Sequence, residues 1–159
     1  MKEKIVTAEQ ARAIANAMRE HGSKLVFTNG CFDLLHVGHV RYLAAARALG
    51  DALLVAINGD ESVRGLKGEG RPLNRESDRA EIVAALACVD QVVVFREQRA
   101  TALLEKVRPA IYVKGGDYTA DSLHVEERSA LQRKAIQGQH RSRKTSFVIK
   151  LSDVVVTER

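Results

Sequence analysis

The chain of 159 residues is 45% apolar and 28% charged, and its formal net charge is +5. This size and composition favour a single folded domain and exclude a long disordered chain. No apolar run approaches the roughly 18 residues of a membrane span and the N-terminus is polar, so we expect a soluble, cytoplasmic protein without a signal peptide. The positive charge suits anionic ligands, but it does not choose between nucleotides and nucleic acids.

Helices and buried strands alternate along the predicted chain. The first helix, in 7–22, begins where Thr7 and Gln10 have the spacing of a capping box. A second helix, in 39–50, places Val40 on one apolar face together with the apolar residues three, six and nine positions later. The other predicted elements are strands in 24–29, 52–58, 91–95 and 110–115, and helices in 78–89 and 98–107.

The strands are apolar throughout, and amphipathic helices separate them. This pattern predicts a parallel sheet covered on both faces, which is a doubly wound α/β fold. In such sheets ligands bind at the carboxyl ends of the strands. The polar strand ends in 28–38, 58–60 and 114–118 are therefore the predicted site.

The stretch "FTNGCFDLLHVGH", 27–39, lies at the first of these ends. A helix that starts near Gly38 offers unpaired backbone N–H groups and a positive dipole end to an anion. Gly30 and Gly38 would let the backbone approach a ligand closely. His36 and His39 are spaced so that both rings can donate hydrogen bonds to phosphate oxygens, and a bound triphosphate would favour their protonated form.

Two other readings of this stretch are weaker. Cys31, Asp33, His36 and His39 could form a zinc site, but the glycines and the helix N-terminus would then have no purpose. Cys31 could be a nucleophile, but it lacks the accompanying pattern of a thiol enzyme and is more simply a small, half-buried filler. The known spacings of phosphate loops and dinucleotide-binding turns are absent as well.

The segment "GCFDLLHVGH" resembles the signature of the H-x-G-H nucleotidyltransferase superfamily, which includes cytidylyltransferases and pantetheine-phosphate adenylyltransferases. The segments "LKGEGRPLN", "DRAEIVAAL", "VDQVVVF" and "VKGGDY" follow in the same order as in the heptose 1-phosphate adenylyltransferase (ADP-heptose synthase) family, which is often fused to a sugar kinase. The resemblance covers 24–123 and implies a Rossmann-like nucleotidyltransferase fold. Only about twenty residues precede the first strand, so we do not expect a kinase domain on this chain.

The resemblance implies a reaction in which a sugar 1-phosphate and ATP give an ADP-sugar and pyrophosphate. Because the attacking phosphate is already ionised, catalysis would consist of positioning and charge neutralisation without a general base. The implied catalytic residues are His36, His39 and Lys67. The residues implied to bind the nucleotide are Thr28, Asn29, Gly30, Phe32, Asp33, Gly38, Arg79, Lys114, Gly115, Gly116, Asp117, Tyr118, Thr145 and Ser146.

Lys67 lies in "LKGEGRP", where the neighbouring glycines suggest a mobile loop that closes over the triphosphate. Arg79 is implied to face the phosphates, and Arg71 is a weaker candidate for the same role. Asn58 and Asp60 could line the sugar side, although Asp60 is equally well explained as a helix cap.

The C-terminal segment, 124–159, departs from the family pattern. Thr145 and Ser146 would replace its paired hydroxyls, and no clear apolar strand precedes them. The preceding stretch, 128–144, has six lysines and arginines and no acidic residue, which is more typical of a solvated basic tail than of an ordered site. We therefore divide the single predicted domain into an N-terminal helix (1–23), the nucleotidyltransferase motifs (24–123) and this divergent segment.

The predicted ligands are ATP, Mg²⁺ that enters with it, and a sugar 1-phosphate, and we expect a homodimer without a membrane partner. One alternative is a cytidylyltransferase that uses CTP and glycerol 3-phosphate, and another is a nucleotide-binding module without turnover. A nucleic-acid partner is not expected, because aromatic residues make up 4% of the chain, tryptophan is absent and there is no stacking motif.

Overall fold

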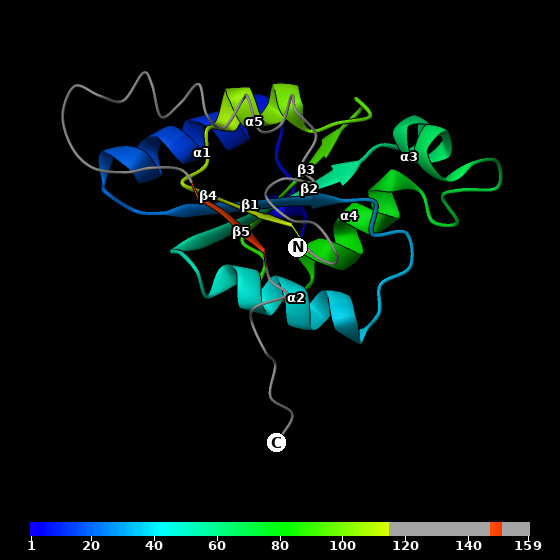
Figure 1. Ribbon diagram of the computed structural model, residues 1–159, viewed down its shortest axis with the longest axis horizontal. Coiled ribbons are helices and arrows are strands. Elements are labelled where there is room, and N and C mark those ends of the chain that lie inside the picture. Colours follow the sequence, from blue (N-terminus) through cyan, green and yellow to red (C-terminus); the bar gives the residue numbers. More distant parts are fainter. Residues whose placement is uncertain (115–146, 151–159) are drawn as a thin grey trace.

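A parallel sheet of five strands forms the centre of the molecule, in the order β3-β2-β1-β4-β5 (Figure 1). The computed structural model describes residues 1–114 and the backbone of 147–150. The strands are β1 (Leu25–Gly30), β2 (Ala52–Asn58), β3 (Gln91–Phe95), β4 (Ile111–Lys114) and β5 (Phe147–Lys150). The helices are η1 (Lys2–Lys4, a 3-10 turn), α1 (Ala8–Glu20), α2 (Val37–Arg47), α3 (Asp60–Lys67), α4 (Glu76–Ala84) and α5 (Thr101–Val107).

Helices cover both faces of the sheet, with α1 and α5 on one side and α2 and α4 on the other (Figure 1). Alternate residues of each strand point to opposite faces, so Phe27 and Leu54 pack under α1 and α5 while Val26 and Leu53 pack under α2 and α4. Burial of the central strands on both faces explains why their sequences are apolar throughout. The doubly wound α/β prediction is confirmed.

The start of α1 confirms the predicted capping box. The backbone N–H of Gln10 donates to Thr7 Oγ1 at 3.2 Å, and the backbone N–H of Thr7 donates to Gln10 Oε1 at 2.8 Å. The four strands predicted from apolar runs all form, with ends that shift by one residue at most. Local sequence therefore determines both kinds of element well.

Four features differ from the predictions. Helix α3 and strand β5 were not predicted, and the helix predicted in 78–89 instead spans 76–84. Val40 is 38% exposed, because α2 contacts the sheet mainly through Leu43 and Ala46 in its middle.

No helix in the described ranges is long and apolar enough to cross a bilayer.

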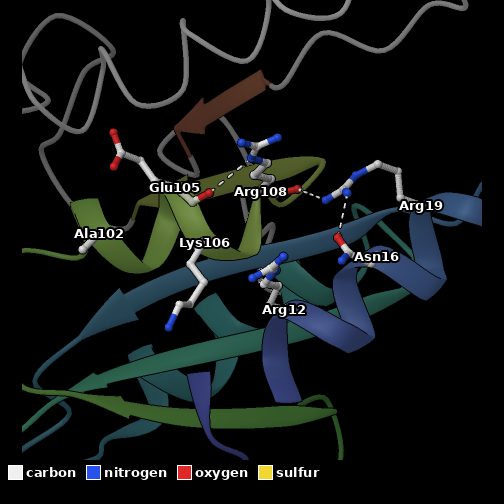
Figure 2. Close-up of a pocket in the computed structure, with 7 residues that line it drawn as sticks. All are labelled: Arg12, Asn16, Arg19, Ala102, Glu105, Lys106 and Arg108. Carbon is white, nitrogen blue, oxygen red and sulfur yellow. Dashed lines mark hydrogen bonds between the residues drawn. The ribbon is translucent and has the colours of Figure 1, made fainter. Parts of the chain in front are cut away.

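Polar contacts fasten α1 to α5 beside an open hollow of about 590 Å³ on the outer surface of these helices (Figure 2). Arg19 donates to Asn16 Oδ1 at 2.9 Å and to the main-chain carbonyls of Val107 and Arg108 at 3.2 and 2.9 Å. Lys106 forms an ion pair with Glu9 of α1. Arg19 thereby satisfies carbonyls at the C-terminal end of α5, which lack partners within their own helix.

Candidate active site

The carboxyl ends of the parallel strands meet at one edge of the sheet, on the side where α3 lies in Figure 1. Gly30 ends β1 there, Asn58 ends β2 and Lys114 ends β4. The turn between β1 and α2, which contains the H-x-G-H segment, forms part of this edge. The tertiary structure thus brings together the strand ends that the sequence marks as polar.

The two histidines of this turn cap the first turn of α2. His36 is the N-cap residue, and its Nδ1 accepts a hydrogen bond from the backbone N–H of Gly38 at 3.1 Å. The backbone N–H of His36 in turn approaches Nδ1 of His39 at 3.4 Å. A Cβ atom on residue 38 would lie 2.8 Å from Cε1 of His36, so a larger residue there would displace this ring from its capping position.

This capping pattern fixes the tautomer of both imidazoles. A nitrogen that accepts a hydrogen bond carries no proton, so each neutral ring of His36 and His39 holds its N–H at Nε2. The two ring centroids are 4.0 Å apart. Burial, the nearby His36 and the charge of Lys67 lower the pKa of His39, which favours its neutral form. The pair can therefore donate from Nε2 to an anion.

Phe32 packs against the His39 ring and supports the histidine pair. Its φ of 46° is left-handed, and its ring is buried against Gly30, where a Cβ atom would come within 3.0 Å of Phe32 Cε2. The same ring meets His39 edge-on at a centroid distance of 5.4 Å. Gly30 and Phe32 thus act on the site by placing the His39 ring.

Thr28 and Asn29, also predicted to bind nucleotide, connect elements of the scaffold. The Tyr42 hydroxyl of α2 donates its proton to the carbonyl of Val113 at 3.1 Å. The same oxygen lies 2.5 Å from Thr28 Oγ1, and because its one proton is already used, the Thr28 hydroxyl is the donor in this second hydrogen bond. Burial raises the pKa of Tyr42 to about 12, so the phenol keeps its proton. Asn29 Oδ1 accepts from the Tyr112 hydroxyl at 2.7 Å. These bonds tie β1 to α2 and β4.

Asp33 faces the protein interior. Its carboxylate pairs with Arg71 at 2.8 Å and accepts from the backbone N–H of Leu73 at 2.7 Å, and the side chain of Asn74 donates to its carbonyl at 2.9 Å. Burial alone would raise its pKa, but Arg71 and the two backbone donors of residues 73 and 74 outweigh it and lower the pKa of Asp33. The carboxylate is thus an internal anchor.

Arg79 is also internal, contrary to the expectation that it faces the phosphates. Its side chain is 0% exposed. The guanidinium donates to the carbonyl of Cys31 at 2.5 Å, to the carbonyl of Asn74 at 3.0 Å and to Asp60 Oδ1 at 2.8 Å. Because each nitrogen already has a partner inside the protein, Arg79 holds the wall of the site together.

Asn58 and Asp60, which the sequence suggested for the sugar side, both make contacts within the protein. The Asn58 amide donates to Ser62 Oγ at 2.9 Å inside the protein, and Asp60 pairs with Arg79. The N-cap of α3 is Gly59, so the helix-cap explanation of Asp60 is wrong.

Lys67 and Lys114 supply positive charge at this edge. Lys67 is exposed, and its charge acts on both His39 and Cys31. Lys114 also acts on Cys31, and its ammonium lies 5.8 Å from the Tyr112 ring centroid. Lys67 is the last residue of α3, which corrects its predicted place within a loop. The left-handed glycines, Gly68 and Gly70, come after it.

The cysteine and metal alternatives find little support. Burial raises the pKa of the Cys31 thiol, even though Lys67 and Arg79 act in the opposite direction. The carboxylate of Asp33 is occupied by Arg71 and backbone donors. Within residues 1–114 and 147–150, no three His, Cys, Asp or Glu side chains are grouped so that they could hold a metal ion.

Six predicted nucleotide-binding residues lie outside the described residues. They are Gly115, Gly116, Asp117, Tyr118, Thr145 and Ser146. Conversely, sequence reasoning missed Tyr42, Asn74 and Glu76, which fasten the wall of the site through contacts to residues far away in the sequence. No local signal marks these three residues, because their roles depend on tertiary contacts.

The chain is similar in sequence to known bifunctional proteins. The chain is 52% identical over 120 residues to the bifunctional protein HldE of Geobacter metallireducens, which covers 76% of this chain and 24% of that protein. It is 58% identical over 115 residues to HldE of Citrifermentans bemidjiense, covering 71% of this chain and 23% of that one. The chain thus spans about a quarter of the length of these relatives.

Solved structures show the same fold. The lipopolysaccharide core biosynthesis protein of Thermoplasma volcanium superposes with a TM-score of 0.63 at 26% identity, covering 81% of this chain and 96% of the other. Pantothenate synthetase of Thermus thermophilus superposes with a TM-score of 0.57 at 12% identity, covering 92% of this chain and 60% of the other. This is a likeness of fold alone. The model of the cytidylyltransferase-like family matches residues 27–157, and the chain therefore belongs to this family of nucleotidyltransferases.

Proposed function

We propose that the chain is an adenylyltransferase that joins a sugar 1-phosphate, heptose 1-phosphate in particular, to ATP and releases pyrophosphate. The observation that carries this proposal is the reciprocal capping of His36 and His39, which leaves an N–H at Nε2 of each ring beside the charge of Lys67. The likeness to the HldE proteins supports the choice of ATP and of a heptose.

In the proposed reaction an oxygen of the sugar phosphate attacks the α-phosphorus of ATP. The bond between the α-phosphorus and the bridging oxygen breaks, and pyrophosphate leaves with the electron pair. His36 and His39 would donate hydrogen bonds from Nε2 to phosphate oxygens, while Lys67 would neutralise the charge that grows during transfer. No protein base is needed, because the nucleophile is already an anion.

Magnesium belongs to this proposal as part of the substrate. Asp33 and Asp60, the carboxylates nearest to the turn, are held by Arg71 and Arg79, so these residues do not fit a resident metal ion. Mg²⁺ would enter bound to ATP and contribute charge neutralisation on the phosphates. We further propose that the protein works in the cytoplasm as a homodimer, the latter testable by analytical ultracentrifugation.

The direct test is a substrate screen. Heptose 1-phosphate and Mg²⁺ are combined with each of the four nucleoside triphosphates, and pyrophosphate release is measured. We expect release with ATP, and a large loss of it in His39→Ala but not in Lys2→Gln, a charge change on the exposed N-terminal turn. Release with CTP and glycerol 3-phosphate instead would favour the cytidylyltransferase alternative. Tight ATP binding without release would identify a binding module.

A further inference from the structure

Helix α3 is anchored at its first residue. Asp60 Oδ1 accepts from the buried guanidinium of Arg79 at 2.8 Å, and the backbone N–H of Asp60 donates to Glu76 Oε2 at 2.8 Å. Both partners belong to α4. The start of α3 is therefore fixed to α4 by two independent polar contacts.

The chain that follows α3 is anchored as well. Arg71 pairs with Asp33 at 2.8 Å, and the backbone N–H of Leu73 donates to the same carboxylate at 2.7 Å. Asp33 is only 4% exposed and belongs to the turn that carries the two histidines. The end of the segment 68–73 is thus fixed directly to the H-x-G-H turn.

Arg79 joins the two anchors. Besides Asp60, it holds the carbonyl of Cys31 in the histidine turn and the carbonyl of Asn74 beyond the second anchor. A planar guanidinium can serve three such acceptors in fixed directions, which a lysine ammonium at the same place could not reproduce. The start of α3, the segment after it and the histidine turn consequently share one buried hub.

Lys67 lies between these anchors and differs from them. It is exposed, and within the described part of the chain it makes no ion pair or hydrogen bond. Its charge nevertheless reaches His39 and Cys31. The anchors on either side therefore restrain the backbone from which the Lys67 side chain extends.

We propose that Asp33, Asp60 and Arg79 are positioning residues that fix Lys67 relative to His39, and that they do not contact the nucleotide. This inference rests on the proposed function for the role of Lys67 in catalysis, whereas the geometric part stands without it. It assigns a purpose to Asp33 and Arg79, two polar residues that the family resemblance implied would bind the nucleotide.

The geometric part is tested by the pKa of His39, measured by NMR in the protein without substrate. Lys67→Met removes a nearby positive charge and should raise this pKa. Asp60→Asn should also raise it, because release of α3 moves Lys67 away. Loss of the Asp60 carboxylate by itself would act in the opposite direction, since a nearby anion favours the imidazolium, so the sign separates displacement from a direct charge effect.

Two further variants complete this measurement. Asp60→Glu keeps the charge but moves the anchor, and should give a smaller rise; it also serves if Asp60→Asn does not fold. Asp90→Asn breaks the Arg47–Asp90 pair, 2.7 Å long and distant from the histidine turn in the fold, and should leave the pKa of His39 unchanged. An unchanged or lower pKa in both Asp60 variants, or an equal rise in Asp90→Asn, would overturn the proposal.

The catalytic part is tested by a double-mutant cycle. Asp60→Asn should lower kcat by about 10- to 100-fold, as expected for a misplaced group, with a smaller change in KM for ATP. In a Lys67→Met background the same substitution should cost no further kcat, because it acts through Lys67. Full additivity would overturn the positioning role. Absence of turnover in the wild type would contradict the proposed function alone, because the NMR result does not depend on turnover.

Discussion

Two arginines on opposite faces of the sheet make the same kind of contact and differ in burial. Arg79, in the wall of the candidate site, donates to two main-chain carbonyls and to the carboxylate of Asp60, with no exposed side-chain surface. Arg19, which links α1 to α5, also donates to two main-chain carbonyls, but its side-chain partner is the neutral amide of Asn16 and the residue is exposed.

The difference shows how each region uses a positive charge. A guanidinium that still reaches water needs no counter-ion, so Arg19 can serve as a clamp between helices. A fully buried guanidinium must be neutralised and fully hydrogen-bonded, as Arg79 is. Positive charge for a ligand in the site is then left to lysines such as the exposed Lys67, which follows the buried contacts in the fold.

The largest effect is expected for Arg79→Ala. The substitution leaves Asp60 and two main-chain carbonyls without their partner. Breaking an ion pair whose arginine is fully buried costs about 3–5 kcal/mol of stability. Chemical denaturation monitored by circular dichroism measures this loss. A loss of stability no larger than that of Arg19→Ala would show that the buried contacts of Arg79 contribute no more than the exposed contacts of Arg19.

The next largest effect concerns activity. His39→Ala should raise the barrier to turnover by on the order of 3 kcal/mol, as expected when a donor to developing charge is removed, while the fold is retained. The matched control is His21→Ala at the C-terminal end of α1, where Nδ1 lies 2.8 Å from the carbonyl of Ala17. Comparison of kcat in the two variants decides the matter: equal values would remove His39 from the catalytic residues.

Arg19→Ala should have a smaller effect on stability. It removes hydrogen bonds from a charged donor at an exposed position, for which about 1.5 kcal/mol is expected. Urea unfolding gives the stability, and turnover should remain that of the wild type because α1 and α5 lie on the other face of the sheet. A loss of turnover without a loss of stability would contradict the division between the two regions.

The smallest effect is a dependence of stability on pH. Burial, His36 and Lys67 lower the pKa of His39 below its ordinary value of 6.5, so the unfolded chain binds more protons in mildly acidic solution. The contribution of neutral His39 to the free energy of unfolding is complete above pH 6.5. It is lost as the pH falls through the lower pKa that His39 has in the folded state. Asp33 makes stability depend on pH only in more acidic solution, because its pKa lies below 3.8.

Urea midpoints measured from neutral to mildly acidic pH test this expectation. The loss of stability should shrink in His39→Gln and persist in His21→Gln, which again compares the two faces of the sheet. The same slope in His39→Gln as in the wild type would assign the effect to another group.

Local sequence predicted the first helix and four of the five strands, but not α3 or β5. The capping box of Thr7 and Gln10 involves residues one helical turn apart, and the strands follow from unbroken apolar runs. The sequence also marked His36, Gly38 and His39 as one local group, although their capping hydrogen bonds, which span at most three residues, were not predicted. Such features are readable in a sequence because every interacting group lies within one short segment.

The roles of the charged residues were decided by tertiary structure alone. An arginine in "DRAE" has every appearance of an exposed helical residue, and only folding brings Asp60 and the carbonyl of Cys31 to Arg79. Likewise Asp33 meets Arg71 across a long separation in sequence. Whether a charge becomes an internal anchor or, like that of Lys67, stays available to a ligand depends on burial and on partners from distant segments, which no local pattern encodes.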